Sequence, residues 1–514
     1  MKPKEWNEGL NHLDQDLVDE YIKKKEERKE TRRPFWMMTV AAALALTTTL
    51  GLLMSRGLLP NNAPTLETVP VTAVPTAPRP IETNPPSTEP PQPVLVPLNN
   101  LVASPVYPTM SQYPDGTKIN PYSAAFSNAY YAWELDRKLQ YQQPDGYANS
   151  LTEFFYTSMQ QFLQGEGNQV YSPLNVYLAM AMLAETAEGN SRQQILDLFG
   201  LDTIQQLREQ VDNLWNAHYC DDGITDTVLA NSLWLDDEYS FKEEVTQILA
   251  DRYYASSFSG DLGSEAMNKQ LQSWINENTG GLLAEQANNV KLDRNTAFSL
   301  ASTVYFTASW DKKFGVKNTK DALFHAADAD KKVPFMNTTL LEYQYYWGEN
   351  FGAVQLNLTG HNSMWLILPD EGYTVADILA SDEYLQMTMN PMAWENRKKL
   401  DINLSMPKFD VAQQQDLVSG MMALGVTDVF DAATSDFSAL TDETPLWIEK
   451  INHASRVVID EDGCKGAAYT VIPLAGMAPP QDVDEIDFVL DRPFLFVVSS
   501  QDNLPLFAGT VNKP

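Results

Sequence analysis

Apolar and polar positions follow the periods of regular secondary structure from about residue 148 onward. SLTEFFYTSMQQFL (150–163) places apolar residues at helical spacing behind Ser150, a residue suited to capping a helix. SPLNVYLAMAMLAETAEG (172–189) predicts a helix that opens with proline and is buried on most sides. Segments rich in β-branched and aromatic residues, which predict strands, come later: 297–306, 353–360, 363–369, 399–411, 494–501 and 504–511. Early helices and late strands predict an α+β fold with a large sheet.

The chain before this region has a different pattern. Residues 35–54 are twenty uncharged residues, which at helical rise span about 30 Å, the thickness of a bilayer core. The stretch 23–33 carries seven basic and three acidic residues, which places the N-terminus in the cytoplasm. We therefore predict a cytoplasmic head (1–33) and an uncleaved transmembrane anchor (34–55). A buried soluble helix and a cleaved signal peptide are the alternatives, but the head is long for a signal peptide and no clear cleavage site follows.

Residues 60–97 contain twelve of the 31 prolines, a composition that favours extended polyproline II over a packed core. We predict a stalk over 56–97, with a reach on the order of 120 Å at about 3.1 Å per residue. Residues 98–147, rich in Tyr, Asn and Pro, are interpreted as an N-terminal extension of a folded domain at 148–514. The expected location is the cell membrane, single-pass, with this domain outside the cell. A secreted or shed form is the alternative.

The formal net charge of -32 is distributed unevenly. Residues 1–33 hold nine basic and nine acidic side chains and residues 34–55 hold none, so the net negative charge lies after residue 55. Such a surface repels nucleic acid, and we exclude nucleic-acid binding. The two cysteines, Cys220 and Cys464, lack metal-ligand spacing, and a disulfide framework is excluded as the source of stability.

Motifs of catalytic sites are missing from the sequence. There is no G-x-S-x-G elbow, no H-E-x-x-H and no G-x-x-x-x-G-K-[ST] phosphate loop. Cys464 and His453 can be imagined as a nucleophile and its base, but no sequence signature supports that pair. We therefore expect that the protein is not an enzyme and needs no cofactor or metal.

Motifs in order along residues 148–514 resemble those of the serpins, a family of serine protease inhibitors. The matching segments are 170–200, 274–283, 300–314, 406–411, 424–440, 451–463, 491–498 and 504–514. The resemblance implies a serpin-like α+β fold with a large central β-sheet, further sheets, about nine helices and an exposed reactive-centre loop. The tethered architecture resembles that of membrane-anchored serpins of Gram-positive bacteria.

The resemblance assigns the span after Gly463 to the reactive-centre loop. In serpins a target protease cleaves this loop and forms an acyl-enzyme; the cleaved loop then inserts as a new central strand, which distorts the protease. The implied loop hinge is Glu461, Gly463, Cys464, Lys465, Gly466, Ala467 and Ala468.

Insertion places alternate residues of the loop on opposite faces of the sheet. If Cys464 faces the core, the inward set continues with Gly466, Ala468, Thr470 and Ile472. These residues are small or uncharged, which suits insertion because a buried charge near the hinge would stall it. A flexible surface loop is the alternative. The family usually has Thr, Glu and Ala at positions 464, 465 and 466, and Gly466 weakens strand propensity.

Inhibitory serpins usually carry a polar cluster under the sheet, the shutter, built from two serines, an asparagine and a histidine. Ser172 and His453 match two of these positions. Asn175 stands at the second serine position and Ser302 at the asparagine position, so we predict that the two residue types exchange places in one cluster. Ordinary polar substitution is the alternative.

Counting in the family's usual register places Met477 before the scissile bond and Ala478 after it. Leu474–Ala475 and Gly476–Met477 are the alternative bonds. Methionine at this position predicts a target serine protease with apolar specificity, elastase-like or subtilisin-like, with a cysteine protease as a second candidate partner. We expect a monomer. The alternative function is that of a non-inhibitory serpin-fold protein for surface binding or adhesion.

Overall fold

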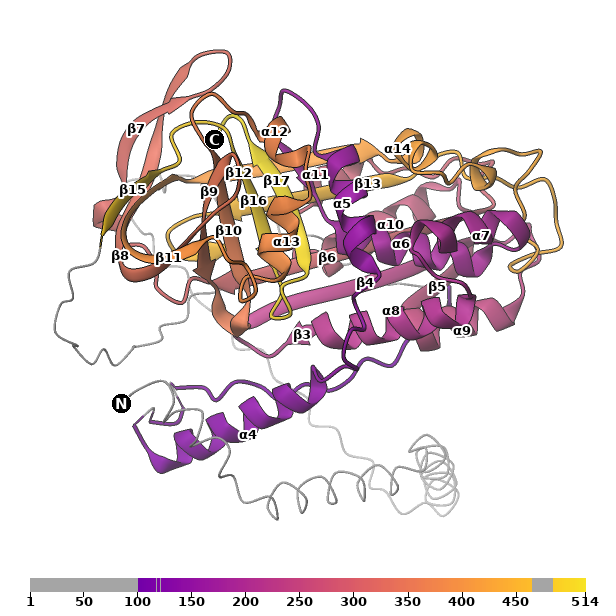
Figure 1. Ribbon diagram of the computed structural model, residues 1–514. Coiled ribbons are helices and arrows are strands. Elements are labelled where there is room, and N and C mark those ends of the chain that lie inside the picture. Colours follow the sequence, from indigo (N-terminus) through magenta and orange to yellow (C-terminus); the bar gives the residue numbers. More distant parts are fainter. Residues whose placement is uncertain (1–99, 117, 121, 465–483) are drawn as a thin grey trace, which may run out of the picture. The chain divides into compact units, whose positions relative to one another are not determined.

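A computed structural model describes residues 100–116, 118–120, 122–464 and 484–514 of the protein (Figure 1). They form two β-sheets, one of eight strands and one of nine, with helices packed around them. The predicted head, anchor and stalk lie outside the described residues. Within the described part, none of the helices combines the length and the apolar character needed to cross a bilayer.

The eight-stranded sheet is called the central sheet below. Its strand order is β1-β5-β4-β6-β14-β13-β12, and β3 pairs with β4 beside this path. The β4–β5 pair is parallel, whereas the ladders from β4 through β6, β14 and β13 to β12 are antiparallel. The strands are β1 (Leu101–Ala103), β3 (Cys220–Asp221), β4 (Thr225–Asp236), β5 (Ala255–Gly260), β6 (Phe298–Ser309), β12 (Phe409–Asp416), β13 (Asn452–Ile459) and β14 (Gly463–Cys464).

The nine-stranded sheet has the order β15-β11-β8-β9-β10-β16-β17-β2, with β7 paired to β8. Its β11–β15 pair is parallel. The strands are β2 (Gln169–Tyr171), β7 (Lys320–His325), β8 (Asp330–Trp347), β9 (Phe351–Asn357), β10 (Ser363–Pro369), β11 (Arg397–Pro407), β15 (Glu485–Val489), β16 (Phe494–Ser499) and β17 (Pro505–Val511).

Eleven α-helices lie in the described residues, and together with the two sheets they confirm the predicted α+β class. The resemblance implied about nine; α4 lies before residue 148, where the predicted serpin domain begins, and α12 is a helix of only five residues. The helices are α4 (Ala124–Gln140), α5 (Leu151–Phe162), α6 (Pro173–Thr186), α7 (Gly189–Leu198), α8 (Ile204–His218), α9 (Glu243–Tyr253), α10 (Glu265–Asn278), α11 (Ala284–Asn289), α12 (Val375–Leu379), α13 (Glu383–Met389) and α14 (Val418–Ala423). Three short 3-10 turns are η1 (Val316–Asn318), η2 (Thr359–His361) and η3 (Asp428–Phe430).

The helix predicted to open with proline is α6, and all but one of its side chains are buried. Pro173 occupies its first turn, and the Ser172 hydroxyl accepts a hydrogen bond from the Asn175 N–H at 3.4 Å. Ser150 behaves differently from the expectation. It precedes α5, but its hydroxyl accepts a hydrogen bond from Gln210 Nε2 at 2.7 Å and makes no cap.

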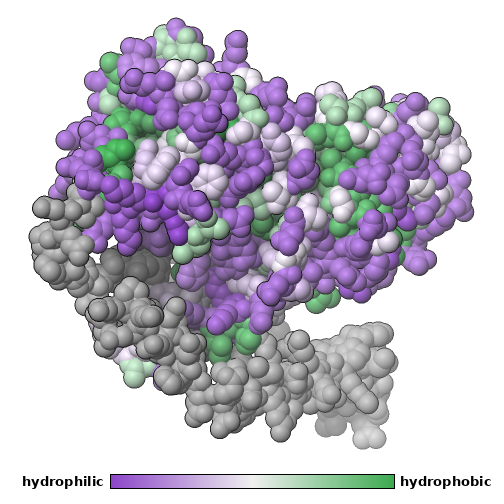
Figure 2. Space-filling model, viewed as in Figure 1, coloured by the Kyte–Doolittle hydropathy of each residue, from purple (hydrophilic) through white to green (hydrophobic). Residues whose placement is uncertain are grey.

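Apolar side chains lie on both faces of the central sheet. Burial alternates along β13, where residues 453, 455, 457 and 459 are buried and their neighbours are more exposed. The buried side joins the main core, whereas Trp234 and Trp274 belong to a smaller core between the opposite face and α10. The surface seen in Figure 2 is mostly hydrophilic, as the net charge of -32 predicts. A strand added between β6 and β13 would therefore place alternate residues in the main core, beside the buried residues of β13.

Candidate functional site

Residues 460–464, called the loop root below, connect β13 to the predicted reactive-centre loop. The chain turns after Ile459, and β14 then runs between β6 and β13. Gly463 pairs with Ser309, and Cys464 pairs with both Ala308 and Ile459. Among the described strands, β6 and β13 are joined only through the two residues of β14. The loop root therefore occupies the position that a newly inserted strand would extend.

The rest of the predicted loop cannot be placed in the same way. The following predicted site residues lie outside the described residues: Lys465, Gly466, Ala467, Ala468, Met477 and Ala478. The chain is described again from residue 484, and β15 begins at Glu485.

Glu461 is the most strongly bonded side chain of the loop root. Its Oε1 accepts a hydrogen bond from the Thr319 hydroxyl at 2.7 Å, and its Oε2 forms an ion pair with Lys408 Nζ at 2.7 Å. Burial works to raise the pKa of Glu461, but the hydrogen bonds from Lys408 and Thr319 outweigh it and hold the pKa below its ordinary value. Glu461 is therefore an ionised anchor between the loop root and the end of β11.

The turn between β13 and β14 is fixed by residues that follow β6. The Trp310 indole N–H donates to the Asp460 carbonyl at 2.9 Å, and its backbone N–H donates to the Asp462 carbonyl at 3.0 Å. Lys313 Nζ lies 2.8 Å from the Asp462 carboxylate. These contacts tie the turn to the end of β6, one of the two strands that insertion has to separate.

Gly463 permits a close approach of two backbones. Its φ is +150°, and a Cβ at this position would lie 2.3 Å from the Ala308 carbonyl oxygen and 2.7 Å from Ser309 Cα. No side chain fits such a contact, because both neighbouring atoms belong to the backbone. Glycine is therefore required here for β14 to reach its partner β6.

Cys464 faces the main core, the condition on which the predicted alternation depended. Its side chain is 4% exposed and belongs to the cluster that includes Ala308 and Ile459. Burial, with the nearby Asp460 charge, raises the pKa of the thiol to about 12. A buried, protonated thiol is a poor nucleophile, which argues against the imagined catalytic pair with His453.

His453 lies on β13, the strand that leads to the loop root, and is 4% exposed. Its Nε2 accepts a hydrogen bond from the Ser172 backbone N–H at 3.2 Å and lies 2.9 Å from the Ser455 hydroxyl. Because a backbone N–H can only donate, Nε2 is an acceptor and the Ser455 hydroxyl must donate to it. Burial lowers the pKa of His453 to about 4, so the ring is neutral near pH 7.

The other two predicted shutter residues meet in an unexpected way. Asn175 Nδ2 donates to the backbone carbonyl of Ser302 at 3.1 Å. The Ser302 hydroxyl itself is buried and has no hydrogen-bond partner among the described residues. Ser172 and His453 are thus joined directly, Asn175 is bonded to the backbone of β6, and the serine hydroxyl that bonds to the His453 ring is that of Ser455.

Sequence reasoning missed several residues of the site. Sequence reasoning could have found Ser455, because a residue two positions after His453 lies on the same face of the same strand. Sequence reasoning could not have found Lys408 and Trp310, because their partners are 53 and 150 positions away along the chain. Only the folded topology brings these groups to the loop root.

Comparison with known proteins identifies the family. The sequence model described as "Serpin (serine protease inhibitor)" matches residues 149–514. Alpha-1-antiproteinase of Callosciurus caniceps is 28% identical over 357 residues, 68% of this chain and 83% of that protein. Leukocyte elastase inhibitor of Homo sapiens is 28% identical over 360 residues, 68% of this chain and 93% of that protein.

Solved structures agree with the sequence match. The crystal structure of the thermophilic serpin Tengpin in its native state has a TM-score of 0.63 and 24% identity, and the match covers 73% of this chain and 95% of that one. The likeness at this level of identity concerns the fold alone. Since the family match spans most of the sequence, from residue 149 to residue 514, the chain belongs to the serpin family.

Proposed function

We propose that this protein is a suicide inhibitor of serine proteases, cleaved between Met477 and Ala478 and completed by insertion of the cut loop into the central sheet. The observation that carries the proposal is β14, whose two residues already lie between β6 and β13 with Cys464 in the core. Membership of the serpin family supports it, as do relatives named as inhibitors of leukocyte elastase.

The register at β14 predicts where each inserted residue would lie. Cys464 pairs with Ala308 on one side and with Ile459 on the other, and both ladders are antiparallel. Continuing the ladders by six residues brings Thr470 opposite Ser302 and His453, on the inward face. The hydroxyl of Thr470 would then arrive beside the Ser302 hydroxyl, which has no hydrogen-bond partner within the described part of the uncut chain.

The residues around the proposed bond favour proteases with apolar specificity. Met477 is preceded by a Leu-Ala-Gly stretch, and no Lys or Arg occurs from residue 466 to residue 491. A trypsin-like enzyme therefore lacks the cation that its specificity pocket binds, whereas elastase-like and subtilisin-like enzymes accept such side chains. A cysteine protease of similar specificity is a second candidate target.

We also propose that the inhibitor is held at the outer face of a cell membrane by residues 34–55, with the stalk at 56–97 as spacer. The uncharged run of twenty residues and the basic stretch before it support this topology. Release of the folded domain by cleavage of the stalk is the alternative location.

The test is to mix residues 98–514 with an elastase-type and a subtilisin-type protease and to analyse the products by denaturing gel and mass spectrometry. Inhibition predicts a covalent complex that resists boiling and a released peptide that begins at Ala478. Clean cleavage without a complex would reject the trapping mechanism and favour the non-inhibitory binding protein.

A matched pair of variants separates insertion from binding. Gly466→Glu places a carboxylate on the inward face, where the register brings it between Phe306 and Val457, and it should turn the inhibitor into a substrate. Lys465→Glu changes the neighbouring, outward residue and should leave complex formation intact. Equal behaviour of the two variants would contradict the predicted register.

A further inference from the structure

Arg137, near the end of α4, is a buried residue outside the segment that matches the serpin family. Its side chain is 8% exposed, and its Nη1 forms an ion pair at 3.1 Å with Asp222, which is 2% exposed. Its Nη2 donates to the Gly360 carbonyl at 2.6 Å. One guanidinium therefore joins α4 to two segments of the domain, the turn before β4 and the turn η2. Such a pair is costly to break from one side, because the remaining charge stays buried.

Both segments continue from Arg137 toward the loop root through hydrogen bonds. The Asp222 carboxylate accepts from the Thr225 backbone N–H at 3.0 Å, at the start of β4. Thr359, next to Gly360, accepts from the Thr225 hydroxyl at 3.3 Å and from the Ser309 backbone N–H at 3.1 Å. The two routes from Arg137 thus meet at the ends of β4 and β6.

The end of β6 pairs with β14, and the start of β4 pairs with the same end of β6. Thr225 pairs with Ala308, and Ala308 pairs with Cys464. Ser309 pairs with Gly463. The Ser309 N–H bonded to Thr359 therefore belongs to the strand position that holds the first residue of β14. The path from α4 to the loop root runs only through buried or bonded groups.

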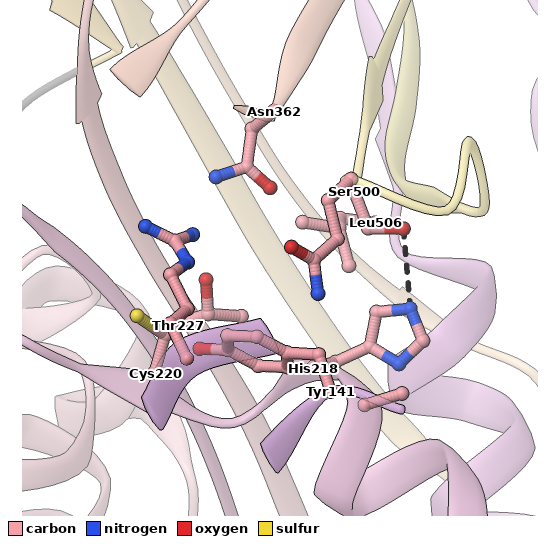
Figure 3. Close-up of a pocket in the computed structure, with 10 residues that line it drawn as sticks. Tyr141, His218, Cys220, Thr227, Asn362, Ser500 and Leu506 are labelled. Carbon is pink, nitrogen blue, oxygen red and sulfur yellow. Dashed lines mark hydrogen bonds between the residues drawn. The ribbon is translucent and has the colours of Figure 1, made fainter. Parts of the chain in front are cut away.

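Gly360 keeps this path tightly packed. Its φ is +75°, and a Cβ there would lie 2.6 Å from the Thr225 hydroxyl oxygen and 2.7 Å from Arg137 Nη2. Arg137 also borders a cavity lined by Tyr141, Cys220 and residues of other elements (Figure 3). This cavity has room for roughly one water molecule, so Arg137 is not placed to bind a substrate.

We propose that Arg137 is a positioning residue for the loop root: docking of α4 through Arg137 holds the ends of β4 and β6 so that Gly463 and Cys464 stay in the central sheet. Undocking of α4 loosens β14 and exposes the Cys464 thiol. The consequence for inhibition rests on the proposed function. A loosened root slows insertion relative to hydrolysis of the acyl-enzyme, so more inhibitor is cleaved for each protease trapped.

The direct test measures the reaction rate of the Cys464 thiol with iodoacetamide in the full chain, read by peptide mass spectrometry. Cys220 borders the same cavity as Arg137, so the test uses a Cys220→Ser background. We expect Arg137→Met to raise the labelling rate of Cys464 by about tenfold or more, because a charged hydrogen-bond network is lost. Arg137→Lys keeps the charge but loses the paired N–H donors of the guanidinium. Its labelling rate should lie between the rates of the original protein and of Arg137→Met.

Arg208→Met is the matched control. Arg208 forms an ion pair with Glu185, which is 2% exposed, and the Glu185 carboxylate also accepts from the Tyr253 hydroxyl of α9, so the pair makes no direct bond to the ends of β4 and β6 or to the loop root in the described part of the chain. Loss of general stability would raise Cys464 labelling in both variants, and that result would overturn the proposal, as would an unchanged rate in Arg137→Met. If Arg137→Met fails to fold, Gly360→Ala perturbs the same contacts and is judged by the same readout.

Inhibition gives a second readout that keeps the two proposals apart. Arg137→Met should raise the number of inhibitor molecules consumed per protease, with the rate of initial association unchanged. If the unaltered protein traps no protease, the proposed function fails while the thiol result still decides the role of Arg137. If trapping is normal and the stoichiometry is unaffected by Arg137→Met, the positioning role is rejected and the function stands.

Discussion

Replacing His453 with glutamine should remove a large part of the acid sensitivity of the folded domain. Burial lowers the pKa of His453 from 6.5 to about 4 in the folded protein. The unfolded chain therefore binds the proton more readily than the folded one between these two values. The contribution to stability is fully present above pH 6.5 and is lost as the pH falls toward 4.

The size of the effect follows from the two pKa values. At about 1.36 kcal/mol per pKa unit, the full loss is roughly 3 kcal/mol below pH 4, and about 2 kcal/mol of it falls between pH 7 and pH 5. Glutamine lacks a titrating group but offers an oxygen that can accept the Ser172 N–H. His453→Gln should therefore be somewhat less stable at pH 7 and lose about 2 kcal/mol less on going to pH 5.

Urea unfolding midpoints at pH 7 and pH 5 measure the difference, with the rate of heat inactivation as a second measure where unfolding is irreversible. The exposed residue His325 supplies the control, and His325→Gln should leave the acid sensitivity in place. If the original protein and His453→Gln lose the same stability between the two pH values, His453 does not carry a depressed pKa and the assignment of its neutral, accepting ring is wrong.

Three further predictions test the loop root and the register. Glu461→Gln should lower the unfolding free energy by about 1–3 kcal/mol, because a charged hydrogen-bond pair with Lys408 is weakened, whereas Asp462→Asn at an exposed pair should cost less than about 1 kcal/mol; urea unfolding compares the two. Gly463→Ala should cost at least about 1–3 kcal/mol by the clash with the backbone of β6, and a midpoint equal to that of the original protein would contradict the close approach. Thr470→Val should reduce the rise in melting temperature that follows loop cleavage, because about 1 kcal/mol of hydrogen bonding is lost. Calorimetry of cut and uncut protein measures this rise, and an unchanged rise would contradict the predicted register.

Local patterns in the sequence predicted the elements that frame the site. The apolar run that opens with Pro173 predicted the buried helix α6, because helical periodicity is carried directly by the sequence. The loop root was assigned by resemblance to the serpin motifs. Burial of Cys464 then fixed the phase of the alternation that sequence reasoning could state only as a condition.

Apart from the contact between Ser172 and His453, the polar contacts of the site could not be predicted from the sequence. Ser302 was expected to contribute its hydroxyl, but Asn175 bonds to its carbonyl oxygen instead. Arg137 and Asp222 are 85 positions apart, and nothing in either segment marks them as partners. Side-chain rotamers and long-range pairing decide such contacts, and both depend on the packed structure rather than on local pattern.

The two ends of the reactive loop are fastened to different sheets, β14 to the central sheet and β15 to the nine-stranded one. The uncut chain can therefore extend β14 only until the loop is fully stretched, unless β15 detaches from β11. These two strands pair over five positions, 401–405 of β11. Of these five residues of β15 only Phe488 is buried. Under the proposed function, the lifetime of the uncut inhibitor therefore depends on the height of the barrier to detaching β15 rather than on an equilibrium, and β15 is a short strand with one buried side chain.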